Sequence, residues 1–134
     1  MACTEWTQEL ETGIKEIDSQ HRQFVNLINE LDDAIKTSNA DGIKHVIEGV
    51  LNHTVTHFEF EEELMRKAEF PSLKSHQRSH EFFMRKIAVL RGNFHAGENV
   101  SQLLLSTLKG WLVSHIKGED RDYIDSVKKI TGEI

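Results

Sequence analysis

Apolar side chains recur along the chain at alternating intervals of three and four residues, in four separate segments. The first segment shows the pattern clearly, from Ile14 through Ile17, Phe24 and Ile28 to Ile35. Because an α-helix turns once every 3.6 residues, this spacing gathers the apolar side chains on one helix face. Each segment is therefore predicted to be an amphipathic α-helix whose apolar face is buried.

Turn-forming residues separate the predicted helices. Residues 37–42 (TSNADG) are predicted to form the turn after the first helix, and the second helix is predicted over about residues 41–67. Pro71 is expected to stop the second helix, because proline cannot continue one. Ser72 is expected to cap the third helix, since a serine hydroxyl can accept a hydrogen bond from the first helical turn.

Glycines and an asparagine over residues 92–99 indicate a loop, after which the fourth helix is predicted to begin near Val100. Residues 120–130 are expected to form a short C-terminal helix, and Trp6 to pack an N-terminal arm onto the bundle. No repeat or linker divides the sequence, so residues 1–134 are predicted to form a single domain. Long amphipathic helices with short loops favour an all-α, antiparallel up-down-up-down four-helix bundle. The alternative is a helical-hairpin pair that dimerises.

Composition and charge narrow the functional classes. The formal net charge of −6 disfavours nucleic-acid binding, and no apolar run approaches the roughly 20 residues of a membrane span. Cys3 is the only cysteine, and residues 1–11 lack the features of a signal peptide, so we expect a cytoplasmic protein. The unusual feature is the presence of eight histidines, whose positions decide whether they form a site.

Five histidines lie on the apolar helix faces at a common depth. His21 lies early in the first helix, His57 late in the second, His76 and His80 at the start of the third, and His115 late in the fourth. Successive helices of an antiparallel bundle alternate in direction, with a rise of about 1.5 Å per residue. The five imidazoles are therefore predicted to meet at one end of the bundle.

Two carboxylates accompany these histidines along the chain. His57 and Glu61 are four residues apart, so they share a helix face. His115 and Asp120 are five residues apart, which turns about 140° around an ideal helix. Both can point inward only if the helix kinks, bulges or ends between them, and Gly118 would permit such an irregularity.

Each of these residues also has an ordinary structural interpretation. A single histidine on an apolar face is usually a core residue bonded to a backbone carbonyl. Glu61 alone could be a surface carboxylate, as Glu59, Glu62 and Glu63 beside it are expected to be, and Asp120 alone could cap a helix. Together, however, seven such groups at one buried level would each cost several kcal/mol if unsatisfied. A metal site removes that cost and is the better hypothesis.

The number of ligands indicates two metal ions, because seven protein ligands exceed the six positions of one octahedral ion. If both carboxylates and one solvent oxygen bridge two octahedral ions, the five histidines leave one position open. That position is suited to a small diatomic molecule. Mixed imidazole and carboxylate ligands favour iron or manganese over a structural zinc.

Four segments of the sequence carry these residues in the order found in the hemerythrin family. They are IDSQH at 17–21, HFEFEE at 57–62, HQRSH at 76–80, and HIKGED at 115–120 with Tyr123. The chain resembles stand-alone bacterial members of that family. The resemblance implies two iron ions joined by an oxo or hydroxo bridge, with dioxygen bound reversibly at one of them. Its implied ligands are those of a saturated iron (His76, His80, His115), those of the iron with the open position (His21, His57), and the bridging carboxylates (Glu61, Asp120).

Reversible binding requires a dry pocket, because water or protons would convert the centre to its oxidised form. Apolar side chains beside the ligands or one turn deeper are candidates for its lining, although each also suits ordinary core packing: Phe24, Ile28, Phe58, Trp111, Leu112 and Ile116. His53 is expected to lie behind the ligands or to be partly exposed. Tyr123 either hydrogen-bonds near the site or simply packs there.

The expected function is therefore a non-enzymatic oxygen carrier, store or supplier, with dioxygen as its partner and a monomeric state. The alternatives are a di-iron redox enzyme, a nitric-oxide scavenger, and a sensor that signals to a separate protein. Ferritin-like di-iron proteins use Glu-x-x-His pairs, and no histidine in this sequence has a glutamate three residues before it. That difference counts against the enzyme hypothesis.

Overall fold

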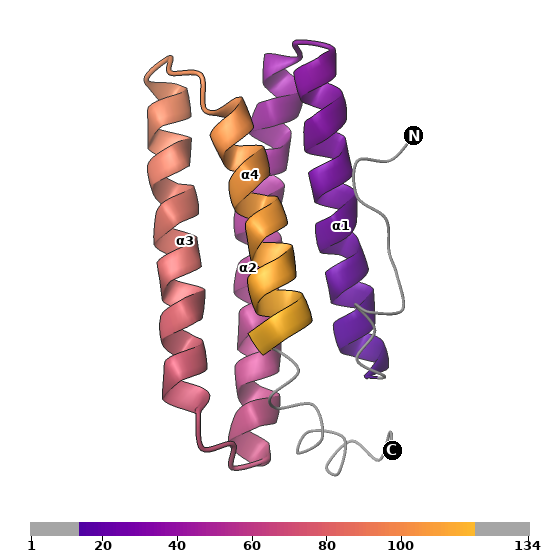
Figure 1. The fold of residues 1–134 in the computed structure, drawn as a ribbon, viewed down its shortest axis with the longest axis vertical. Coiled ribbons are helices and arrows are strands. Elements are labelled where there is room, and N and C mark those ends of the chain that lie inside the picture. Colours follow the sequence, from indigo (N-terminus) through magenta and orange to yellow (C-terminus); the bar gives the residue numbers. More distant parts are fainter. Residues whose placement is uncertain (1–13, 120–134) are drawn as a thin grey trace.

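The computed structural model describes residues 14–119, in which four helical segments run alternately in opposite directions (Figure 1). Within these residues no strand occurs. The antiparallel four-helix bundle predicted from the periodicity is confirmed. The predicted N-terminal arm and short C-terminal helix lie outside the described residues. The elements are α1 (Lys15–Lys36), α2 (Ala40–Lys67), α3 (Leu73–His95), α4 (Ser101–Trp111) and a π-helix, η2 (Leu112–Glu119), that continues α4.

The turn between α1 and α2 is shorter than predicted. The side-chain Oδ1 of Asn39 accepts a hydrogen bond from the backbone N–H of Gly42 at 3.0 Å, so Asn39 caps α2. Helix α2 begins at Ala40, one residue before its predicted start, and Asp41 and Gly42, which the predicted turn and the predicted helix shared, lie in its first turn. An asparagine at this position stabilises a helix start by satisfying a backbone N–H that has no partner within the helix.

The connection between α2 and α3 also differs in detail from the prediction. Helix α2 ends at Lys67, before Pro71 is reached, and Glu69 adopts a left-handed backbone conformation with φ of 54°. The N–H of Phe70 bonds back to the carbonyl of Met65 at 3.0 Å, which closes the helix end. Ser72 is the N-cap residue of α3, as predicted, although its side chain makes no capping hydrogen bond.

Two apolar clusters fill the interior of the bundle. The larger one runs along all four helices and includes Ile28, Val50, Ile87 and Leu104. The smaller cluster, built on Ile14, Ile17 and Met65, lies at the end where α1 begins and α2 ends. Ile17 is one turn before His21, and Met65 is one turn after Glu61. The polar residues between the clusters are therefore covered by apolar side chains on both sides.

The helices are not packed equally closely. Helix α1 contacts α2 and α4, and α2 contacts α3, whereas α3 and α4 meet only sparsely. In the described part of the chain, none of the helices combines the length and apolarity needed to cross a bilayer.

Adjacent leucines on α4 provide a test of this packing. Leu104 is fully buried, whereas the side chain of Leu103 is 55% exposed. We expect Leu104→Ala to lower the free energy of unfolding by about 2–5 kcal/mol, because it leaves a cavity in the core. Leu103→Ala should change it by no more than about 0.5 kcal/mol. Urea denaturation of the iron-free protein, followed by circular dichroism, measures both, and equal losses would contradict the burial of α4 described above.

Candidate metal centre

Five histidines and one glutamate, contributed by α1, α2, α3 and η2, meet at one end of the bundle, as their common depth predicted. All six side chains are buried. Their ligand atoms form two groups, in each of which the atoms lie within 4.8 Å of one another. One group is His76, His80 and His115, and the other is His21, His57 and Glu61.

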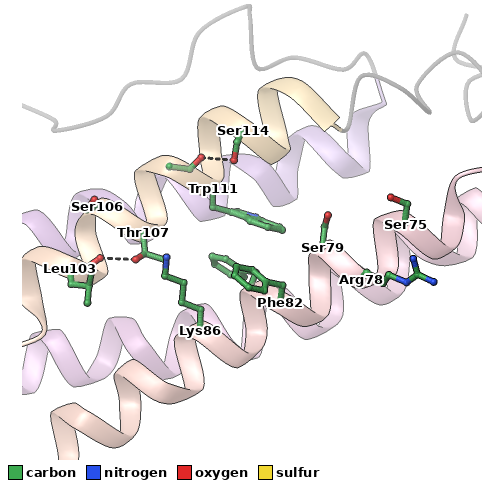
Figure 2. Close-up of a pocket in the computed structure, with 12 residues that line it drawn as sticks. Ser75, Arg78, Ser79, Phe82, Lys86, Leu103, Ser106, Thr107, Trp111 and Ser114 are labelled. Atoms are coloured by element: carbon green, nitrogen blue, oxygen red, sulfur yellow. Dashed lines mark hydrogen bonds between the residues drawn. The ribbon is translucent and has the colours of Figure 1, made fainter.

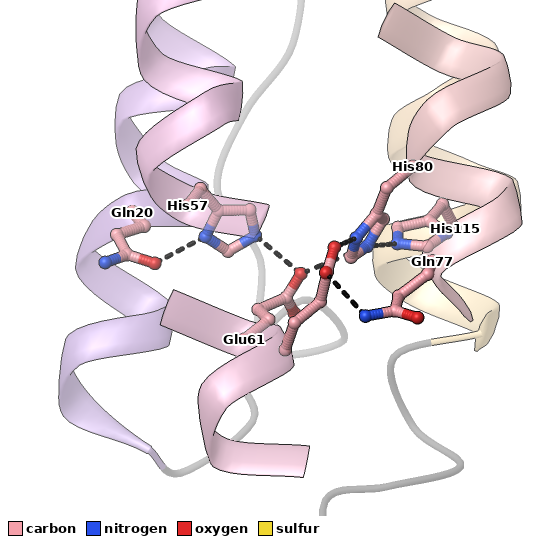
Figure 3. Close-up of polar contacts among 7 residues, drawn as sticks. Gln20, His57, Glu61, Gln77, His80 and His115 are labelled. Carbon is pink, nitrogen blue, oxygen red and sulfur yellow. Dashed lines mark hydrogen bonds and ion pairs between the residues drawn. The ribbon is translucent and has the colours of Figure 1, made fainter. Parts of the chain in front are cut away.

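Glu61 connects the two groups. Its Oε1 lies 3.1 Å from Nε2 of His57 and 3.6 Å from Nε2 of His80 (Figure 3). The Nε2 atoms of His80 and His115 are 3.0 Å apart, and the rings of His21 and His57 have centroids 4.9 Å apart. The two groups are therefore immediate neighbours, with one carboxylate oxygen in contact with both.

The backbone around His115 has the irregularity that the spacing of His115 and Asp120 predicted. The π-helix η2 spans Leu112–Glu119, so it includes His115 and begins well before Gly118. In a π-helix, hydrogen bonds join residues five apart rather than four apart, which reduces the angular offset between such residues. Single π-helical turns often occur at functional sites. Asp120 itself lies outside the described residues, so its predicted role stays a prediction.

Glu62 is a site residue that the sequence analysis placed wrongly on the surface. Its Oε2 accepts a hydrogen bond from the Nδ1–H of His80 at 2.8 Å, and its Oε1 accepts one from the side-chain amide of Gln77 at 3.1 Å. The Glu62 side chain is only 22% exposed. A carboxylate behind an imidazole fixes its tautomer and directs the other ring nitrogen toward the metal position. The adjacent Glu61 gave no signal that its neighbour would turn toward α3.

Gln20 has the corresponding position behind His57. Its side-chain Oε1 accepts a hydrogen bond from the Nδ1–H of His57, so that Nε2 is directed toward Glu61 (Figure 3). The two histidines are thus oriented by different partners, a charged carboxylate for His80 and a neutral amide for His57. The sequence analysis did not assign this role to Gln20.

His53 lies behind the ligands and belongs to neither group, as predicted. Its ring stacks in parallel with that of His57, with centroids 5.8 Å apart and an interplanar angle of 5°. Burial, followed by the neighbouring His57 and His21, lowers the pKa of His53 from 6.5 to about 4, although a hydrogen bond with the backbone of Gln20 raises it. His53 is therefore neutral at physiological pH and adds no charge to the site.

Aromatic side chains form a wall between the histidines and the larger apolar cluster. Phe58 stacks on His80 with centroids 3.7 Å apart, and Trp111 stacks on His115 at 3.9 Å. Phe83 packs against Trp111, and Phe24 against Phe83. Of the predicted lining residues, Phe24, Ile28, Phe58 and Leu112 are buried, and Trp111 is partly buried. The side chain of Ile116 lies outside the described residues.

A comparison with models of known protein families identifies the family to which this chain belongs. Residues 12–126 match the model of the hemerythrin HHE cation binding domain. The chain belongs to the hemerythrin family. Among relatives, a bacteriohemerythrin from Stenotrophomonas maltophilia is 41% identical over 96% of this chain and 84% of its own length. One from Pseudomonas aeruginosa is 39% identical over 100% of this chain and 88% of its own length.

Solved hemerythrin structures have the same fold. A crystal structure of wild-type hemerythrin superimposes with a TM-score of 0.87 at 30% identity, covering 94% of this chain and 98% of that one. A crystal structure of a hemerythrin mutant gives a TM-score of 0.88 at 29% identity and covers 95% of this chain. The resemblance to the hemerythrin family inferred from the sequence motifs is therefore confirmed.

Two neighbouring glutamates test the role of the carboxylate behind His80. We expect Glu62→Ala to lower metal affinity about 10–100-fold, because His80 loses the partner that orients it. Glu62→Gln, which keeps an acceptor oxygen without the charge, should give an intermediate loss. Glu63 is the matched control, since its side chain is 52% exposed and pairs with Arg66. Iron retained in competition with a chelator is the measurement, and a Glu63→Ala loss as large as that of Glu62→Ala would contradict the assigned role.

Proposed function

We propose that this chain binds dioxygen reversibly at a non-haem di-iron centre and acts as an oxygen carrier, store or supplier rather than as an enzyme. The observation that carries the proposal is the pair of adjacent, buried ligand groups with Glu61 between them. The names of the relatives, bacteriohemerythrin and hemerythrin, support it. We further infer that residues 1–134 form one domain, because the family match extends over residues 12–126.

The residues present fit a pair of iron ions. Each group offers imidazole nitrogens, and the shared carboxylate offers oxygen, a donor set that suits iron. Thiolates, which favour zinc or iron–sulfur sites, are absent from residues 14–119. In this proposal His76, His80 and His115 hold one ion and His21 and His57 hold the other. Glu61 would be shared between the two ions, and Asp120 would be the second shared carboxylate.

The difference in histidine number between the groups supports binding of a small molecule at one ion. Three imidazoles would hold one ion and only two the other, so the second ion would keep a position for a small molecule. When bound in the ferrous state, the two ions supply that position and one electron each to dioxygen. The histidines keep the ions in place, with His80 held by Glu62 and His57 held by Gln20.

The aromatic wall favours reversible binding over further chemistry. Phe24 and Phe58 are at most 5% exposed, so they exclude water from the interior side of the site. The buried hydroxyl of Thr54, one turn before Phe58, donates to the carbonyl of Val50 at 2.7 Å. Its proton is therefore engaged within its own helix and is not offered to a bound ligand. A dry wall without ionisable groups limits protonation of reduced oxygen and thereby favours its release.

Cycling between oxygenated and deoxygenated states tests the proposal directly. The purified protein, loaded with iron and reduced without oxygen, should develop a visible charge-transfer band when oxygen is added and lose it when oxygen is removed. The band should return over repeated cycles. One-way conversion to a diferric spectrum would favour the alternative of a redox enzyme, and the absence of any band would rule out the di-iron assignment.

Alanine variants of two histidines on α2 test whether oxygen binding depends on the site. His57→Ala should abolish the reversible band, because the ion with the open position loses one of its two imidazoles. His45→Ala is the control, since His45 is exposed on the same helix and belongs to neither group. Retained oxygen binding in His57→Ala would refute the role proposed for His57.

A further inference from the structure

The two halves of the bundle differ in charge, although the whole chain is acidic. Helix α1 carries five acidic and three basic residues, and α2 carries six acidic and three basic residues. Helix α3 instead carries five basic residues and one acidic residue, and α4 carries one basic and no acidic residue. Within residues 14–119, α3 and α4 are therefore net basic, although the chain as a whole has a net charge of −6.

A groove of about 750 Å³ lies between these two helices, where α3 and α4 meet sparsely (Figure 2). Arg78, Phe82 and Lys86 follow one another at intervals of four residues along its α3 side. Phe82 is 69% exposed, and Leu103 on the α4 side is 55% exposed. An apolar centre with cations on either side is typical of a surface that binds an acidic partner transiently.

The two cations of the groove are available to a partner. Arg78 and Lys86 are exposed, and neither forms an ion pair with any other residue of the 14–119 segment. Other basic residues of α3 are engaged, since Arg91 pairs with Glu48 at 2.6 Å and Arg85 approaches Glu81 at 4.0 Å. The groove thus concentrates unpaired positive charge beside exposed aromatic surface.

The groove is in contact with the metal centre through Trp111. This side chain lines the groove, reaching from α4 toward α3 (Figure 2), and its ring stacks on His115 at 3.9 Å with an interplanar angle of 13°. Phe83, which also lines the groove, stacks on Trp111 with ring centroids 4.3 Å apart. A single aromatic ring therefore separates the surface of the groove from a candidate iron ligand.

We propose that the α3/α4 groove is the docking surface for an acidic one-electron carrier protein that returns the oxidised centre to its oxygen-binding state. The inference rests on the proposed function, because only a ferrous centre binds oxygen and a centre that has oxidised needs electrons from outside. Two encounters complete the step. In each, one reduced carrier would give up one electron and one ferric ion would become ferrous. Over the two encounters together, solvent would supply the single proton that converts an oxo group between the ions to a hydroxo group.

Charge reversal in the groove tests the proposal by stopped-flow kinetics. The probe is a reduced, acidic plant-type ferredoxin mixed with the diferric protein. We expect the second-order rate of reduction to fall with ionic strength, and the double variant Arg78→Glu/Lys86→Glu to be roughly tenfold or more slower at low salt. The matched control is Lys44→Glu/Lys67→Glu on α2, which changes the net charge equally on the opposite half. Its rate should stay close to that of the wild type.

A small-molecule reductant separates docking from damage to the site. Photoreduced riboflavin is small and needs no protein docking surface, so it should reduce the wild type and both double variants at nearly the same rate. Equal slowing of both variants with ferredoxin would show an effect of net charge alone and would overturn the proposal. An unchanged rate in Arg78→Glu/Lys86→Glu would overturn it as well.

Binding measurements identify any other occupant. Oxidised ferredoxin, titrated into the isotope-labelled diferric protein, should shift amide resonances of α3 and α4 in the NMR spectrum. If the wild type self-associates and the charge reversal abolishes this, the groove binds a second copy of the chain. If dodecanoate binds and ferredoxin does not, the groove binds a small amphiphilic anion. Either result overturns the proposal. Oxygen cycling after chemical reduction is measured separately, so loss of the proposed function and loss of the docking surface are distinguishable.

Discussion

Burial of five imidazoles and a carboxylate at one level of an apolar bundle is the constraint on which the rest of this structure depends. An unsatisfied polar group in such a place costs several kcal/mol, so every member of the layer needs a partner. The layer draws on all four helical segments, and therefore they must pass the same depth in alternating directions. The small apolar cluster around Ile17 and Met65 closes one side, and the larger cluster closes the other. Metal ions held by this layer would satisfy its polar atoms without admitting water.

The residues behind the ligands make the two halves of this layer unequal. A carboxylate accepts from His80 in the group of three histidines, whereas an amide accepts from His57 in the group with Glu61. A carboxylate makes the imidazole that it holds a stronger donor to a metal than a neutral amide does. The centre therefore combines a difference in ligand number with a difference in ligand basicity. In the proposed di-iron centre, both differences would distinguish the ion with the open position from its neighbour.

One aromatic side chain contacts both the site and the outer surface of the bundle. Trp111 connects the site with this surface, because it stacks on His115, packs against Phe83 and lines the groove between α3 and α4. Sparse packing of α3 against α4 leaves that groove accessible, whereas α1 and α2 contact each other more closely. The basic character of the exposed helix faces then follows from the distribution of charge along the sequence.

The sequence alone determined the helices, their alternating directions and the depth at which His21, His57, His76, His80 and His115 meet. These properties follow from the spacing of residues along one helix and from simple geometry, so no knowledge of neighbouring helices is needed. The irregular backbone near His115 was also predictable, because a five-residue spacing does not fit one face of an α-helix. The extent of η2, which begins at Leu112, was not.

Only the tertiary structure decided which flanking polar residues serve the site. Glu59, Glu62 and Glu63 are alike in sequence, yet Glu62 alone among them turns toward His80 and Gln77 of α3, while Glu63 pairs with Arg66 at the surface. Gln20 likewise gains its role from His57 on a different helix. The direction that such a side chain takes depends on which group the adjacent helix presents to it. That contact joins residues far apart in the chain, and local spacing carries no information about it.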